Sequence, residues 1–272
     1  MVAATANRSH LCSKSGKSNF QEVCAVQTPS STETYEAMPY GVFLNMIQEI
    51  GGKKGLDIDM NKAVFGLNRG GQRMFGCIDL DGYEHMGKSM GISLGFRASH
   101  DKSMRCDVCF GTRVFVCDNM AFTAYSGEGF AARKIYHKHT GGIDETLPIR
   151  ISDAFDAIPD YIRFHEEFYG KLKDITLENT AAYATIVRAM RAEAINNNDI
   201  PAVADEWDYQ AEEPKIITHA WHPEFQERTA LSLFNAFTEI HKDFQDKNPV
   251  EASKRSIRLN EFFYSEFVDS WN

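Results

Sequence analysis

The polar cluster Ser99-His100-Asp101-Lys102-Ser103 lies between two alternating apolar runs and holds the residues best suited to chemistry. His100 could be a metal ligand or a general base, with Asp101 orienting it or binding a divalent metal. Lys102 could bind an anion such as phosphate, and either serine could be a nucleophile beside an aligned base. The competing interpretation is a turn, in which Asp and Ser side chains accept hydrogen bonds from nearby backbone N–H groups. The residues alone leave both interpretations open.

Cysteines provide a second group of candidates. Cys117-Asp118-Asn119 ends the next apolar run, where a cysteine is more often a small buried hydrophobe and Asp-Asn a strand exit. Cys106 and Cys109 suggest zinc by their spacing. In a strand, however, positions three apart point to opposite faces, whereas a zinc site needs both sulfurs on one side. We therefore predict no metal site from the cysteines, and the role of Asn119 stays open.

A basic segment follows, in which Lys and Arg residues surround Tyr136. This composition is typical of an edge that contacts phosphates and stacks one base. It is equally typical of a solvated edge strand, where charge discourages pairing with other chains. The candidate phosphate-binding residues are Arg97, Lys102, Arg113, Arg133, Lys134 and Lys138.

The charge is distributed unevenly over the 272 residues, whose formal net charge is −9. Residues 71–140 hold 9 Lys/Arg and 7 Asp/Glu, giving +2, and residues 141–272 hold 13 and 25, giving −12. This argues against a simple basic nucleic-acid coat but allows a local anion-binding surface. No apolar run approaches the roughly 18 residues of a membrane helix, and the N-terminus lacks the apolar region of a secretory signal. We expect a cytoplasmic protein without a disulfide framework and without membrane contact.

The periodicity predicts an α+β fold, with an antiparallel strand-rich N-terminal module followed by a helical C-terminal module. Residues 1–36 are interpreted as a mobile N-terminal arm in which "FQEVCAV" is a candidate edge strand. Residues 37–142 are predicted to form a helix and a sheet carrying the polar clusters. Residues 143–272 are predicted to form a helical module packed on that sheet. Asn68-Arg69-Gly70-Gly71 is predicted to be a hairpin turn, because apolar runs flank it on both sides.

Four ordered motifs resemble the phage- and plasmid-like proteins of domain-of-unknown-function family 932. They are Ser99–Ser103, Arg113–Asn119, Lys138–Thr140 and Asn235–Glu239, and the resemblance spans about residues 30 to 270. Ala98 stands where that family usually has asparagine. The resemblance implies one shared polar site built from His100, Asp101, Asn119 and His139, with Asn235 and Glu239 supporting it from one helix face. The full set of expected polar-site residues is Ser99, His100, Asp101, Ser103, Asn119, His139, Asn235 and Glu239.

Three hypotheses for function follow. The first is a phage or plasmid protein that binds single-stranded nucleic acid during replication or recombination, in the cytoplasm of a bacterial host cell and as a homo-oligomer. The second is a metal-dependent hydrolase or nuclease, with His100 as base and Asp101 or Asp118 holding a divalent metal as its cofactor. The third is a protein whose acidic helical half binds and blocks a host factor. The family implies association with mobile elements and transfers no activity.

Overall fold

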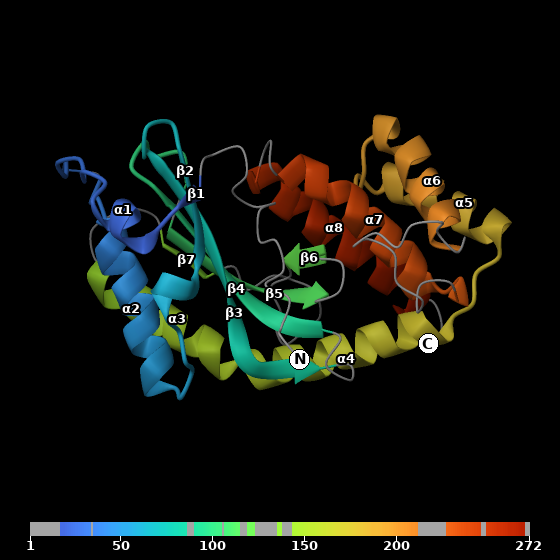
Figure 1. Cartoon of the computed structure of the whole chain (residues 1–272), viewed down its shortest axis with the longest axis horizontal. Coiled ribbons are helices and arrows are strands. Elements are labelled where there is room, and N and C mark those ends of the chain that lie inside the picture. Colours follow the sequence, from blue (N-terminus) through green and yellow to red (C-terminus); the bar gives the residue numbers. More distant parts are fainter. Residues whose placement is uncertain are drawn as a thin grey trace.

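The computed structural model confirms the α+β architecture, with a sheet formed by the N-terminal half and helices dominating the C-terminal half (Figure 1). It describes residues 17–33, 35–85, 90–104, 106–114, 119–122, 135–137, 143–211, 227–245 and 249–269. No helix within these ranges is long and apolar enough to cross a membrane.

Within the described ranges, seven strands make one antiparallel sheet. They are β1 (Lys17–Ser18), β2 (Val64–Asn68), β3 (Arg73–His85), β4 (Met90–Ser99), β5 (Cys106–Val114), β6 (Asn119–Phe122) and β7 (Ile135–His137). Their order is β1-β2-β3-β4-β5-β6, and β7 pairs with β5 beside β6. The predicted hairpins are confirmed, because β2 pairs with β3 and β4 pairs with β5 across the two expected turns.

The segment before the first long helix contains a short helix in place of the predicted edge strand. Helix α1 (Phe20–Cys24) covers most of "FQEVCAV", and the strand β1 lies just before it. The reason is local. The Asn19 side chain accepts a hydrogen bond from the backbone N–H of Glu22, and the Glu22 carboxylate accepts one from the backbone N–H of Asn19. This capping box satisfies the exposed N–H groups of a helix start, which an alternating pattern alone does not reveal.

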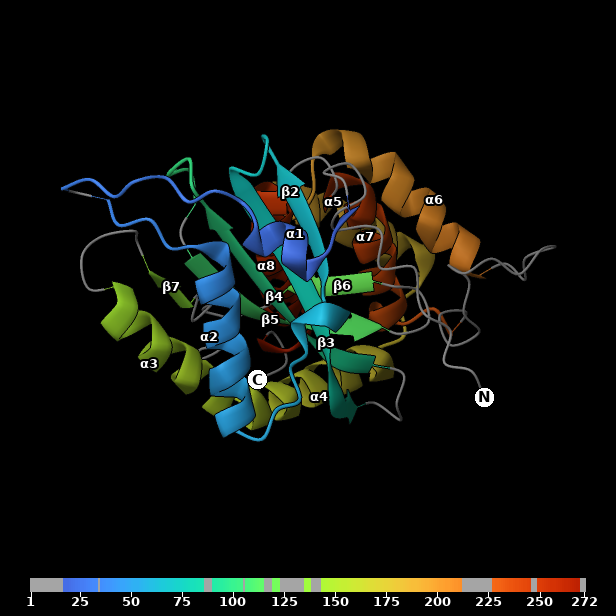
Figure 2. The same cartoon turned by 60° about the vertical axis from the view of Figure 1, so that its left-hand side comes forward.

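Two helices pack on one face of the sheet. Helix α2 (Tyr40–Lys53) and helix α3 (Ile143–Asp156) lie on one side, as Figure 2 shows, and bury alternate strand residues such as Ile78, Leu94 and Phe96. Residues 74–78 of β3 and 91–96 of β4 are all buried, so the central strands are covered on both faces of the sheet.

The helical module consists of α4 (Ile158–Asp174), α5 (Asn179–Arg191), α6 (Ile200–Ala211), α7 (Ala230–Gln245) and α8 (Pro249–Phe267). A one-turn 3₁₀ segment at Asn197–Asp199 lies between α5 and α6, and another at Met60–Lys62 lies just before β2. Helix α4 joins the two cores, because Tyr161 packs in the sheet core and Phe168 in the helical core. Residues 230–238 of α7 are all buried, so that α7 is the central helix of its module.

The first prediction concerns Gly76 in β3, which is paired with Phe65 on one side and Phe96 on the other. A Cβ atom at this position would overlap the ring of Phe96 and approach the Phe65 ring to 2.9 Å. Gly76→Ala is therefore expected to lower the free energy of unfolding by about 2 kcal/mol, through overpacking. Gly170→Ala is the matched control: a Cβ at this position, just before the last turn of α4, meets nothing within 4 Å and should stabilise the protein by about 0.5 to 1 kcal/mol. Urea denaturation measures the free energy of unfolding of both variants. Equal changes in the two would contradict the tight packing around Gly76.

The second prediction concerns His241 on α7, which is buried with its Nε2 3.1 Å from the Ala194 carbonyl oxygen. Burial, and then the charge of Arg255, lower the pKa of His241 from 6.5 to about 4. Below about pH 6.5, His241 is protonated in the unfolded chain but stays neutral in the folded protein until the pH approaches 4. Stability contributed by the neutral ring is therefore present above that pH and falls by roughly 2 kcal/mol between about pH 7 and about pH 5.

His241→Gln tests this, because the glutamine amide can still donate to Ala194 and does not titrate. The variant is expected to lose less stability than the parent between these pH values, as measured by urea denaturation at each pH. Parallel pH profiles of the two proteins would show that His241 does not carry the effect.

Candidate functional site: the sheet end formed by two turns

Two turns lie side by side at one end of the sheet. The first, residues 69–72, joins β2 to β3, and the second, residues 100–104, joins β4 to β5. The register pairs Arg73 with Ser99, and the His100 backbone N–H donates to the Gln72 carbonyl oxygen at 2.8 Å. The antiparallel pairing of β3 with β4 thus brings together two turns that are about thirty residues apart in the sequence.

Both turns hold a cation in a left-handed backbone conformation. Arg69 has φ 52° and Lys102 has φ 62°, a region in which a side chain larger than Asn or Asp is unusual. Gly70 and Gly71, at φ 65° and 88°, are the residues that such a turn normally uses. Arg69 and Lys102 therefore occupy positions where the backbone itself would favour glycine or asparagine.

His100 forms part of the floor of the site. Its side chain is buried, its ring stacks on Tyr40 at 3.9 Å between centroids, and its Nε2 lies 3.1 Å from the Met38 carbonyl oxygen. Burial lowers the pKa of His100, and the hydrogen bond to Met38 opposes this only in part. Nε2 is therefore the protonated nitrogen of a neutral ring, and Nδ1 is buried with no hydrogen-bond partner. The arrangement fixes the segment before α2 against the second turn, and a base buried in this way cannot reach a substrate directly.

The segment before α2 also carries Tyr35, whose hydroxyl lies 3.4 Å from the carbonyl oxygens of Ser99 and His100. The Lys102 ammonium group lies 4.7 Å from the centre of the Tyr35 ring, a cation–π contact. Tyr40 donates to the Gly71 carbonyl oxygen at 3.1 Å, which ties the first turn to the same helix. Two buried tyrosines thus hold both turns from below.

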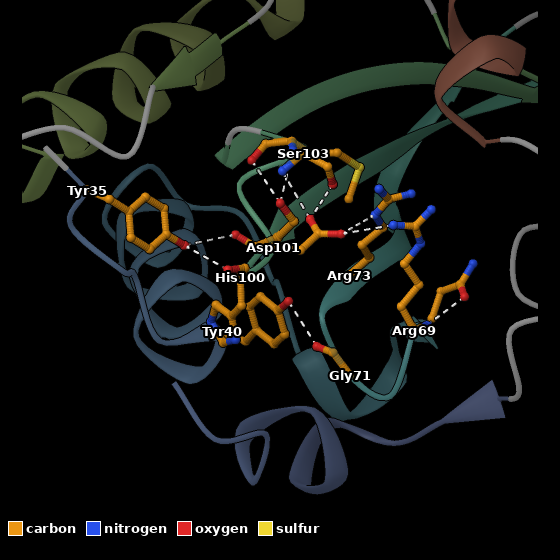
Figure 3. Close-up of polar contacts among 11 residues, drawn as sticks. Tyr35, Tyr40, Arg69, Gly71, Arg73, His100, Asp101 and Ser103 are labelled. Atoms are coloured by element: carbon orange, nitrogen blue, oxygen red, sulfur yellow. Dashed lines mark hydrogen bonds and ion pairs between the residues drawn. The ribbon is translucent and has the colours of Figure 1, made fainter. Parts of the chain in front are cut away.

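Asp101 lies between the turns and divides its two carboxylate oxygens between them (Figure 3). Oδ1 accepts from the Ser103 backbone N–H at 3.0 Å and from the Ser103 hydroxyl, which closes the second turn. Oδ2 accepts from Arg73 Nε at 2.8 Å and lies 3.7 Å from an Nη atom of Arg69. Two guanidinium groups from the first hairpin therefore converge on a single oxygen atom.

The electrostatics of Asp101 follow from these contacts. Partial burial alone would raise the pKa of the carboxyl. The hydrogen bonds from Ser103, and then from Arg73, outweigh burial and lower the pKa to about 2. Asp101 is thus charged at any physiological pH, and two guanidinium groups with one carboxylate leave a net charge of about +1 at an exposed sheet end.

The other predicted site residues are placed as follows. Ser99 is buried, with its hydroxyl bonded to the backbone of Met104, and Arg97 is half-buried on β4, opposite Phe75 and Asp107. Arg113 pairs with Gly91 near the far end of β5. The candidates that fall outside the described residues are Arg133, Lys134, Lys138 and His139, and the Cys117-Asp118 dipeptide is outside them too.

The sheet separates two of the residues expected to share a site. Asn119 pairs with Val114, eight residues along β5 from Cys106, which is about 26 Å from the end where His100 lies. Asn119 is thus not part of the cluster at the turns. Helix α7, which carries the buried Asn235 and the half-buried Glu239, contacts β6, which begins at Asn119. Of the family motifs, Ser99–Ser103 therefore lies at one end of the sheet, and Asn119 of a second motif lies toward the other end.

Arg69, Arg73, Tyr35 and Tyr40 were not among the predicted site residues. The hairpin prediction around Asn68-Arg69-Gly70-Gly71 contained the necessary signal, because alternate turns of an antiparallel meander lie at the same end of the sheet. Among the described residues, no group of three or more His, Cys, Asp or Glu side chains is placed to hold a metal ion.

Comparison with known families gives one match. Residues 29–262 match the family described as Domain of unknown function (DUF932). The chain belongs to this family. No curated protein and no solved structure matches the chain. Family membership therefore agrees with the resemblance drawn from the four motifs and adds no activity to it.

The third prediction follows from the position of His100. His100→Ala removes a stacked buried ring and leaves the Met38 carbonyl oxygen without its donor, so the free energy of unfolding should fall by about 2 to 4 kcal/mol. Lys53→Ala is the control, because the exposed Lys53–Glu49 pair of α2 is screened by water and should contribute little to stability. Denaturation of both variants measures the difference, and a His100→Ala protein as stable as its parent would contradict a structural role.

Proposed function

We propose that this protein binds single-stranded DNA at the sheet end formed by residues 69–72 and 100–104. Binding is through the phosphate groups of the nucleic acid. The observation that carries the proposal is the convergence of Arg69 and Arg73 on one oxygen of Asp101. Guanidinium groups bind phosphate oxygens through paired N–H donors, and two adjacent groups offer more donors than one carboxylate oxygen can accept.

The backbone supports the same conclusion. Arg69 and Lys102 adopt positive φ angles, at a cost that asparagine or glycine would not incur. Cations placed where the turn geometry disfavours them are consistent with a role for their charge, since strained residues tend to cluster at functional sites. Arg69 is also well exposed, with 63% of its side-chain surface accessible, so that a ligand can reach it directly.

The aromatic residues near the site indicate whether binding would depend on the base sequence of the nucleic acid. Tyr35 and Tyr40 are buried, with 6% and 1% of their surface exposed, so neither ring offers a face on which a base could stack. Recognition by these residues would rest on charge. We therefore expect little preference for base sequence and a strong dependence on salt.

The proposal includes a biological setting, which rests on the family resemblance alone. We place the protein in a phage, plasmid or related mobile element, acting in replication or recombination in the cytoplasm of a bacterial host cell, as a homo-oligomer on its DNA. The excess of negative charge in residues 141–272 would keep the helical module away from the bound phosphates.

The hydrolase alternative receives less support from the site. It needs His100 as a general base, and this ring is buried under Tyr40 with Nε2 bonded to Met38. Asp101 is held by Ser103 and two arginines, which leaves it poorly placed to bind a metal ion. The host-factor alternative has no specific contact in its favour.

The fourth prediction tests binding by fluorescence anisotropy of a labelled single-stranded oligonucleotide at about 50 mM and about 200 mM salt. Binding should weaken steeply between the two. Arg69→Asn should weaken it about three- to tenfold at the lower salt and reduce the slope of log affinity against log salt by about 1, because one phosphate contact is lost. The same variant should be as stable as the parent or more stable, because asparagine tolerates the left-handed conformation.

Arg163→Gln is the matched control. It removes one exposed arginine, paired with Asp160 on α4, far along the chain from the turns. It should leave the affinity and the salt slope unchanged. No binding at either salt would overturn the proposed function, and equal losses in both variants would mean that the sheet end is not the site.

A further inference from the structure

The two oxygens of Asp101 serve different partners. Oδ1 belongs to the turn, because Ser103 donates to it from both its backbone N–H and its hydroxyl. Oδ2 belongs to the arginines, because Arg73 Nε donates to it and Arg69 lies within ion-pair distance. The same side chain therefore closes a turn and supplies an anion to two cations.

We propose that Asp101 is an internal competitor of the ligand. Its carboxylate binds Arg69 and Arg73 in the unliganded protein, and a phosphate group displaces it from both arginines. This inference rests on the proposed function and concerns the regulation of the same site. A carboxylate oxygen and a phosphate oxygen make the same charge-assisted hydrogen bonds with guanidinium, so that a phosphate must replace the contacts to Oδ2 to use both arginines fully.

The exposure of the groups allows this exchange without unfolding. Arg69 has 63% of its side-chain surface accessible, whereas Arg73 has 23% and Asp101 has 20%. Arg69 makes the longer contact, 3.7 Å, and can leave Oδ2 by rotating its own side chain. The turn is retained because its bonds go to Oδ1. The competing carboxylate lowers the affinity of the site for any anion. A single anion is then held weakly, whereas a polyanion with several phosphates can still bind through several contacts at once.

Asparagine at position 101 separates the two roles. The amide oxygen can accept from the Ser103 N–H and hydroxyl as Oδ1 does, so that the turn is preserved. The NH₂ group then faces the guanidinium groups, and it is a donor that cannot accept from them. Asp101→Asn thus removes the competitor, raises the local charge by one unit and leaves Arg69 and Arg73 available to a ligand.

The fifth prediction is that Asp101→Asn binds a labelled single-stranded oligonucleotide at least tenfold more tightly than the parent at about 100 mM salt, and that inorganic phosphate displaces the oligonucleotide at lower concentration from the variant. Anisotropy titrations measure both. Asp160→Asn is the control: it makes the same charge change at the exposed partner of Arg163 on α4 and should change neither value by more than about twofold.

Asp101→Ser is the second variant, in case the asparagine protein does not fold. Serine can also accept from the backbone two residues on, and it lacks the charge, so that it should bind more tightly as well. Far-UV circular dichroism and urea denaturation confirm that each variant is folded.

The outcomes distinguish this inference from the function on which it rests. If the parent binds and both position-101 variants bind more weakly, Asp101 positions the arginines for the ligand, and the competitor role is overturned while nucleic-acid binding stands. If Asp160→Asn gains as much affinity as Asp101→Asn, the effect is one of net charge and the inference is again overturned. If neither the parent nor any variant binds, the inference and the proposed function are both wrong.

Discussion

The register between β3 and β4 determines the candidate site. Pairing Arg73 with Ser99 places the turn before β3 next to the turn after β4, and the hydrogen bond from His100 to Gln72 continues the ladder past the last paired residues. A shift by one residue would turn Arg73 and its neighbours to the other face of the sheet. The tight contact of Gly76 with Phe96, which are paired across the same two strands, leaves little room for such a shift.

The side chains at the two turns are arranged in layers, from buried to exposed. Tyr35, Tyr40 and His100 form a buried layer that holds the backbone of both turns. Asp101 comes next, partly exposed, and Arg69 is at the surface. Rigid support from below is what a charged binding surface needs, because side chains held in place lose less entropy when a ligand binds.

The family motif Asn235–Glu239 lies in a different part of the fold, on α7. Helix α7 is buried along most of its length and still carries Asn235, Thr238 and His241, which are polar. Asn235 lies on the helix that contacts β6, at the junction of sheet and helices. Polar groups buried at such a junction specify how two modules fit together, since each needs a partner in one arrangement. The conformation of the junction and the charge of the turns are therefore separate properties of one chain.

The sequence alone determined the fold class and most of the elements, α1 excepted, because periods of 2 and 3.6 residues record which side of an element is buried. It also identified the second turn as a place where Asp101 and Ser103 could bond the backbone, and the first turn through Asn68-Arg69-Gly70-Gly71. It could not assign His100, because a histidine that stacks on Tyr40 and one that serves as a base look the same in a sequence. Nor could it separate Asn119 from His100, since that separation depends on which end of β5 each residue reaches. Only the tertiary structure decided that Arg69 and Arg73 share one oxygen of Asp101, because this contact joins residues brought together by strand pairing and by no local pattern.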